Sequence, residues 1–147
     1  MLLPPFAPYQ YYDYFCNPHY DYICNMNIEN IREYCMSLPM ATEDMAFGDD
    51  CLLLRVCDKI FACISFTRND YFVVKSDPER AIELRERYVE IAPAWHWNKK
   101  YWNEVSLSGT LTDDFVRSLI RHSYAQVVKK LTKRLRDAHP EICEVRE

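Results

Sequence analysis

Glycine is the residue that this sequence most lacks, since Gly48 and Gly109 are the only two in 147 residues. A P-loop, a dinucleotide-binding fingerprint and a nucleophile elbow each need several glycines at close spacing, because the backbone must turn sharply or approach a phosphate. The sequence therefore predicts none of the enzyme classes that depend on those motifs.

Metal-site spacing is also missing. The four histidines form no HExxH pair, and the seven cysteines form no CxxC pair. Cys51, Cys57 and Cys63 fall in apolar, strand-like stretches, so we interpret the cysteines as free thiols that are mostly buried. Free thiols are typical of a reducing compartment, and we expect a cytoplasmic protein with no metal and no cofactor.

Long apolar runs are absent, so the sequence predicts no membrane span. Before Arg32 there is no Lys or Arg, and prolines interrupt the apolar residues of the first segment, which argues against a secretion signal. Residues 1–25 hold six of the eleven tyrosines and four of the eight prolines. We interpret them as an N-terminal extension outside the core, with Met26 as an alternative start.

Residues 26–147 show the periodicities of a single α+β domain. Asn27 and Thr112 are positioned to cap helices, the sequence SDPE at 76–79 reads as a capping box, and residues 40–50 read as a polar loop. We expect an antiparallel sheet with flanking helices. The predicted strands are 51–57, 60–66, 71–76 and 101–107, and the predicted helices are 27–38, 77–88 and a long C-terminal helix that starts at Thr112 and continues into KRLR at 133–136.

Charge is distributed unevenly along the chain. The net charge is −4, yet residues 99–136 contain nine basic and three acidic residues, a net +6 for that segment. A basic segment inside an acidic protein favours an anionic partner such as nucleic acid. The alternative is a solvated helix end that complements the helix dipole.

All three tryptophans lie in PAWHWNKKYWNEV at 93–105. They either seal the edge of the sheet or present aromatic faces beside positive charge to a partner. In a strand, Tyr101, Asn103 and Val105 would face one way and Trp102 and Glu104 the other. The candidate nucleic-acid-binding residues are Asn98, Lys99, Lys100, Arg117, Arg121, Lys129, Lys130, Lys133 and Arg134.

Several motifs together resemble the MmcQ/YjbR family of small bacterial proteins. They are FG at 47–48, KIFA at 59–62, SDPERAIELRE at 76–86, PAWHWNKKYWNEV at 93–105 and LIRHSYAQVVKKLTKR at 119–134. The resemblance spans about residues 27–137. It implies a compact α+β domain with a CyaY-like, or double-wing, arrangement and a DNA-binding function.

The leading expectation is therefore non-enzymatic nucleic-acid binding, to DNA in particular. The alternative is a module that binds a small anionic ligand or a protein through a pocket at His96, Trp97, His122 and Tyr124, provided that the two histidines converge. An enzyme ranks third, because the sequence offers no nucleophile or metal site. The acidic residues Glu29, Glu33, Glu43, Asp44, Asp49 and Asp50 read as a solvated face, with a hard-cation site as the alternative.

Overall fold

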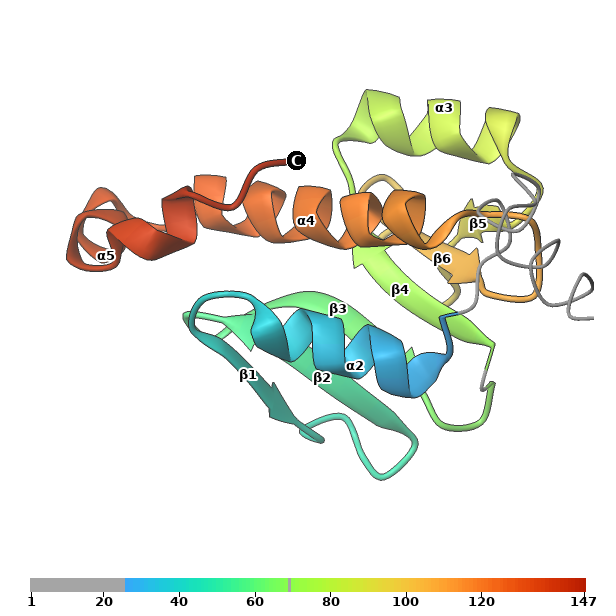
Figure 1. Ribbon diagram of the computed structural model, residues 1–147, viewed down its shortest axis with the longest axis horizontal. Helices are drawn as coiled ribbons and strands as arrows, with labels where there is room; N and C mark the ends of the chain where they lie inside the picture. The colour runs from blue at the N-terminus through green and yellow to red at the C-terminus, as the bar shows by residue number, and fades with distance from the viewer. Residues whose placement is uncertain (1–25, 69) are drawn as a thin grey trace, which may run out of the picture.

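A computed structural model describes residues 26–68 and 70–147. Helices and strands alternate along the chain, and the helices gather on one side of a twisted sheet (Figure 1). In chain order the elements are α2 (Ile28–Ser37), β1 (Ala41–Asp44), β2 (Cys51–Val56), β3 (Lys59–Ser65), β4 (Tyr71–Lys75), α3 (Pro78–Arg87), β5 (Ile91–Pro93), β6 (Trp102–Ser106), α4 (Asp113–Lys129), α5 (Lys133–Ala138) and the 3-10 helix η2 (Pro140–Cys143).

The sheet has six strands in the order β1-β2-β3-β4-β6-β5, and every neighbouring pair is antiparallel. This confirms the predicted α+β class, the antiparallel sheet and the meander of β2, β3 and β4. Between β2 and β3 the register shifts from Leu54 opposite Ala62 to Arg55 opposite Ile60. Phe61 is the extra residue of this bulge, and it turns its ring into the core.

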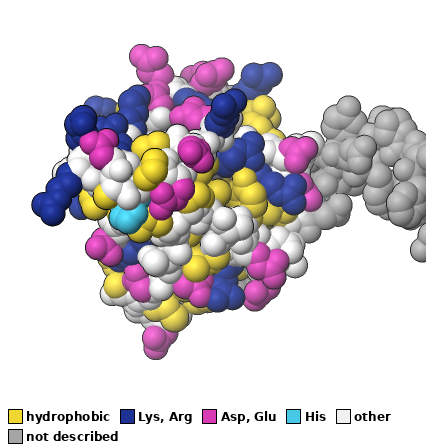
Figure 2. Space-filling view, turned by 60° about the vertical axis from the view of Figure 1, so that its left-hand side comes forward, with side chains coloured by type: hydrophobic (Ala, Val, Ile, Leu, Met, Phe, Trp, Pro, Cys, Tyr) yellow, Lys and Arg dark blue, Asp and Glu magenta, His cyan; other side chains and the backbone are white. Residues whose placement is uncertain are grey.

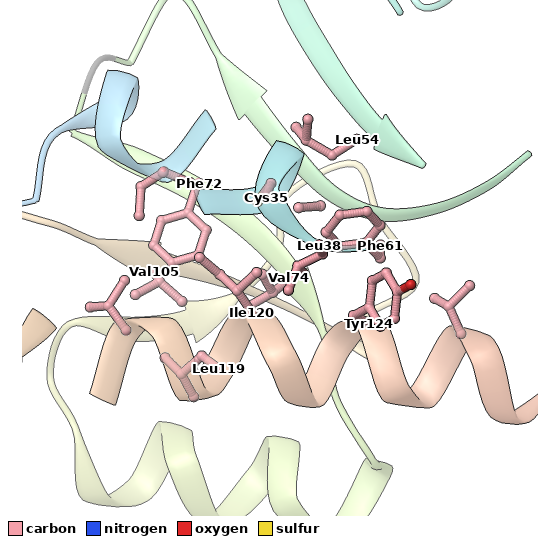
Figure 3. Close-up of a cluster of buried hydrophobic side chains, with 14 of the residues drawn as sticks. Cys35, Leu38, Leu54, Phe61, Phe72, Val74, Val105, Leu119, Ile120 and Tyr124 are labelled. Atoms are coloured by element: carbon pink, nitrogen blue, oxygen red, sulfur yellow. The ribbon is translucent and has the colours of Figure 1, made fainter. Parts of the chain in front are cut away.

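The core lies between the sheet and α4, with α2 beside it (Figure 3). Alternation along β4 and β6 points Phe72, Val74 and Val105 toward the helices. The ring of Phe61 meets Tyr124 of α4 edge to face, with centroids 5.2 Å apart. We call this side of the sheet the helix face.

The opposite side of the sheet, which we call the loop face, carries the alternate strand residues. They are Leu53, Arg55, Cys63, Val73, Lys75, Trp102 and Glu104. Helices α2, α3 and α4 contact the sheet, and within the described ranges the loop face is overlain by the segments 45–50 and 94–101 instead. Loop residues, not helices, therefore shape the surface on this side.

Four details differ from the sequence predictions. Part of the predicted loop at 40–50 is β1, and β5 was not predicted, because both are short edge strands with little periodicity. Helix α3 is capped by Asp77, whose carboxylate accepts from the N–H groups of Glu79 and Arg80, so SDPE is not a capping box that begins at Ser76. Helix α4 ends at Lys129, and Thr132 caps α5 as a separate helix.

The predicted N-terminal extension, residues 1–25, lies outside the described residues. Within the described ranges, Cys35, Cys51, Cys57, Cys63 and Cys143 are free thiols, of which only Cys35 and Cys63 are buried. The helices of residues 26–68 and 70–147 include none that is long and apolar enough to span a membrane.

Candidate functional site

The segment 94–101 between β5 and β6 forms a tight, structured loop. The N–H of Ala94 donates to the carbonyl of Trp102 at 3.1 Å, and the N–H of Trp97 donates to the carbonyl of Ala94 at 3.4 Å. His96 adopts φ +68°, in the left-handed region that non-glycine residues rarely enter. This turn places two exposed rings, Trp95 and His96, next to each other, with centroids 5.4 Å apart.

Arg85 of α3 anchors the other end of this loop. Its Nε donates to Asn103 Oδ1 at 2.6 Å, and its guanidinium also donates to the carbonyls of Lys99 and Trp102. Burial lowers the pKa of Arg85. The exposed Asn98 side chain accepts from the N–H of Lys100 at 3.1 Å, so it shapes the turn that carries the two lysines.

Three ammonium groups surround the ring of Tyr101. Lys130 Nζ lies 4.9 Å from the ring centroid, Lys100 Nζ 5.4 Å and Lys75 Nζ 5.6 Å. We call Lys75, Lys100 and Lys130 the lysine cluster. Burial and the nearby charge of Lys130 both lower the pKa of Lys75. No carboxylate within the described ranges forms an ion pair with any of the three.

A groove of about 460 Å³ opens beside the lysine cluster, at the end of the sheet where β4 finishes and β6 begins. We call it the basic groove. Trp97 and Trp102 provide aromatic surface in it, with ring centroids 4.5 Å apart, while Lys75 and Lys130 supply positive charge. The remaining lining residues are Arg55, Asp58, Lys59, Ile60, Val127 and Leu131.

A second groove, of about 670 Å³, runs over the middle of the loop face, and we call it the aromatic groove. Phe47, Tyr71 and Trp95 line it together with Trp97, which also lines the basic groove. The two grooves therefore share a wall. The thiols of Cys51 and Cys63 lie on its floor, and burial raises the pKa of Cys63.

The other predicted basic residues do not join the lysine cluster. Arg121 donates to Tyr34 Oη at 2.9 Å, and the Arg117 guanidinium lies 5.8 Å from the centre of the same ring, between α4 and α2. Lys133 pairs with Asp137 at 2.8 Å, and Lys129 and Arg134 are exposed toward the C-terminal end. Figure 2, which turns the α5 end toward the viewer, shows Lys and Arg side chains interspersed with Asp and Glu side chains.

Lys99 lies close to the lysine cluster, but its contact is with Trp95, whose ring centroid is 5.4 Å from Lys99 Nζ. Of the predicted nucleic-acid-binding residues, Lys100 and Lys130 therefore converge on the ring of Tyr101. Lys75 completes that set. The sequence reasoning missed it, because alternation along 71–76 places Lys75 on the face opposite Phe72 and Val74 but does not indicate which loop lies over it.

The two candidate histidines lie on opposite faces of the sheet, so the condition for a shared pocket is not met. His96 is exposed at the aromatic groove. His122 is buried on the helix face, where Nε2 accepts from the N–H of Asp77 at 3.1 Å and Nδ1 lies 3.0 Å from Glu147. Tyr124 is likewise buried in the core, with Oη donating to the carbonyl of Pro39.

Two of the six acidic residues singled out in the sequence, Glu43 and Asp44, pair with arginines. Glu43 forms an ion pair with Arg32, and Asp44 forms one with Arg55, and each contact lowers the pKa of its carboxylate. Within residues 26–68 and 70–147, no group of three or more His, Cys, Asp or Glu side chains is placed to hold a metal ion.

Comparison with known proteins finds related chains of the same fold. The sequence model of the YjbR family matches residues 36–126. The chain is 32% identical to YjbR of Escherichia coli K12 over 112 residues, covering 76% of this chain and 95% of that protein. It is 31% identical to YbdF of Escherichia coli O157:H7, covering 72% and 88%.

Two solved structures are also similar. The crystal structure of Deinococcus radiodurans protein DR2400, a DUF419 domain, superposes with a TM-score of 0.73 at 33% identity, covering 81% of this chain and 91% of that one. A protein from Pseudomonas syringae superposes with a TM-score of 0.57 at 26% identity, covering 67% and 96%.

Proposed function

This chain belongs to the YjbR family, and on that premise we propose that it binds nucleic acid, DNA in particular, through the lysine cluster and without catalysing a reaction. The convergence of Lys75, Lys100 and Lys130 on Tyr101 is the observation that carries the proposal. The charge of Lys130 lowers the pKa of Lys75, so these two cations repel each other, and no carboxylate within the described ranges pairs with either. A phosphate bound beside them would relieve that repulsion.

Lysine contacts to phosphate position the nucleic acid and carry no sequence information. We therefore expect binding that depends strongly on salt and little on sequence. Lys99, beside the exposed ring of Trp95, extends the positive surface along the loop. The proposal includes a cytoplasmic location, which the free thiols support, and a bacterial source, which the bacterial relatives support.

A small anionic ligand is the second candidate, and the basic groove favours it. Its volume of about 460 Å³ lies in the range of small-molecule sites, and aromatic walls with a few cations are typical of such sites. This candidate keeps Trp97 from the predicted pocket, whereas His122 faces the other side of the sheet.

The decisive experiment measures binding of the full-length protein to a labelled duplex of random sequence as a function of salt. Each neutralised phosphate adds about 0.9 to the slope of log affinity against log salt. Lys100→Ala with Lys130→Ala should flatten that slope by up to about 2, since two contacts are lost.

The matched control is Arg87→Ala with Arg146→Ala, which removes two exposed cations away from the loop face. It should leave the slope nearly unchanged. No binding to duplex or single-stranded DNA at about 50 mM salt, where such contacts are strong, would rule out the nucleic-acid proposal. Binding of inorganic phosphate or a mononucleotide in its place would favour the small-ligand candidate.

A further inference from the structure

The aromatic groove continues directly from the basic groove through Trp97, which lines both. The Trp97 ring packs against Trp102 on one side and lies 6.1 Å from Phe47, centroid to centroid, on the other. Trp95 and Phe47 remain 67% and 63% exposed. Aromatic rings therefore line both grooves, from Trp102 in the basic groove through Trp97 to Phe47 in the aromatic groove.

Large exposed rings next to a phosphate-binding surface suit the flat faces of nucleic-acid bases. Base–aromatic stacking is a main source of affinity for single strands, because every base has a π-face and an unpaired base can leave its own stack. In a duplex the bases stack on one another and their Watson–Crick edges are paired. A duplex could touch the lysine cluster but could not place a base in a groove on the sheet.

Polar groups on the floor of the aromatic groove add a preference for one base. Glu104 of β6 lines the groove with its side chain 16% exposed, and it forms an ion pair with Arg68 at 3.2 Å. The Arg68 guanidinium also lies 3.8 Å from the centre of the Tyr71 ring, which holds it in place. One arginine contact leaves acceptor capacity on the carboxylate, which has about four lone-pair sites.

A carboxylate with free acceptor sites matches two adjacent N–H donors on a base. Among the four DNA bases, only guanine carries a ring N–H and an exocyclic amino group side by side on its Watson–Crick edge. The neighbouring guanine oxygen is an acceptor and would face the Arg68 donor. Adenine and cytosine offer a single amino group, and thymine places carbonyl oxygens on both sides of its N–H.

We infer that the aromatic groove takes an unpaired guanine base, with the adjoining phosphates of the single strand on the lysine cluster. The inference rests on the proposed function and adds the class of nucleic acid and the base. Trp95 and Phe47 provide the stacking surface, Glu104 reads the base edge, and Arg68 fixes Glu104.

The test compares single strands of oligo(dT) that carry one central dG, dA or dC, together with the duplex of the dG strand, by fluorescence anisotropy on the full-length protein. The dG strand should bind about five- to a hundredfold more tightly than the others, the range expected for one bidentate base contact. The duplex should bind more weakly than each single strand.

Two variants separate stacking from base recognition. Trp95→Ala should weaken all single strands alike by about five- to a hundredfold, as loss of one stacking ring does. Glu104→Gln should abolish the preference for dG and leave the salt slope unchanged, because the lysine cluster is intact. Ile82→Ala, which truncates an exposed apolar side chain on α3, is the control and should change neither.

A change at the partly buried Glu104 can disturb the fold, so Phe47→Ala, which truncates an exposed ring, provides an independent test. It should weaken the binding of single strands as Trp95→Ala does. Equal affinity for duplex and single strands, with the salt slope retained, would overturn the inference and leave the proposed function standing. Single-strand binding that does not distinguish dG from dA would overturn the role of Glu104. Failure to bind any strand would remove the proposed function itself.

Discussion

On the helix face Phe72 and Val105 are completely buried beneath the helices, whereas on the loop face their neighbours Val73 and Glu104 remain partly exposed. The same two strands thus supply both surfaces, since successive side chains point to opposite sides of a sheet. Burial against α4 selects apolar side chains on one side. Coverage by loops leaves room on the other side for charged groups and for rings that are only half buried.

The two regions also differ in how their polar and charged groups are paired. On the helix face the buried hydroxyl of Ser123 is fully hydrogen-bonded, since it accepts from the N–H of Lys75 at 2.7 Å and donates to the carbonyl of Phe61 at 2.5 Å. At the end of the sheet, by contrast, Lys75 of the loop face lies near Lys130 at the end of α4, and the charge of Lys130 lowers the pKa of Lys75. Binding of an anion would lower the electrostatic energy of such a surface. The helix face gains nothing from an anion, so the two regions differ as a structural scaffold and a candidate binding site.

The largest expected difference between the two faces follows from truncating one phenylalanine on each of them. Phe61→Ala should lower the free energy of unfolding by about 3–5 kcal/mol, because a fully buried ring leaves a cavity against Tyr124. Phe47→Ala removes a ring that is 63% exposed and should cost under about 1 kcal/mol. Urea denaturation measures both. Equal losses would mean that the loop face is a second core.

Histidines provide the next comparison. The pKa of His122 is lowered below its usual 6.5, mainly because the side chain is buried. Glu147 acts to raise this pKa, but its effect is smaller. The unfolded chain then binds more protons than the folded one, so stability is fully present above pH 6.5 and is lost as the pH falls from there toward the folded-state pKa. Protonation of Nε2 would also set a donor against the N–H of Asp77 at the start of α3.

His122→Ala should therefore cost about 1–3 kcal/mol at pH 8, because the Asp77 N–H loses its acceptor. It should also flatten the dependence of the unfolding free energy on pH below 6.5. His96→Ala, on the exposed loop, is the control for the loss of a histidine side chain. Urea titrations at several pH values decide the matter, and an unchanged pH slope in His122→Ala would contradict the assignment.

The smallest expected effect concerns two lysines at the C-terminal end. Lys130→Ala removes a repulsion with Lys75 and should raise the free energy of unfolding by about 0.2–1 kcal/mol. Lys133→Ala loses the pair with Asp137 and should be neutral or slightly destabilising. Thermal unfolding at low and high salt measures both, and the difference should fade at high salt. A destabilising Lys130→Ala would show that the cluster is structural.

Much of the fold could be predicted because its signals are local. Asn27 and Thr112 cap the helices that their sequence positions predicted, and the alternation at 101–107 correctly buries Asn103 and Val105 while Trp102 and Glu104 stay partly exposed. Strands β1 and β5 were missed because pairing with the adjacent strands β2 and β6, and not a pattern in their own residues, determines them. β1 is polar, and two of its residues are held by ion pairs to Arg32 and Arg55. β5 has three residues and ends in proline.

The candidate site was predictable only in part. The segment 93–105 and its lysines were singled out from composition, and the structure places Lys100 and Lys130 together. Lys75 was overlooked because nothing in a single strand indicates which distant loop lies over it. The predicted pocket required His96 and His122 to converge, yet α4 and the loop carrying His96 lie on opposite sides of the sheet.

By itself the sequence determined the α+β class, most helices and strands, and the positive charge of residues 99–136, because capping, periodicity and charge are properties of neighbouring residues. Only the tertiary structure decided which charges meet. Antiparallel pairing of β4 with β6 and the packing of α4 bring Lys75, Lys100 and Lys130 to one ring, while Arg117 and Arg121 turn to Tyr34. Those distances depend on long-range contacts, which no local pattern encodes.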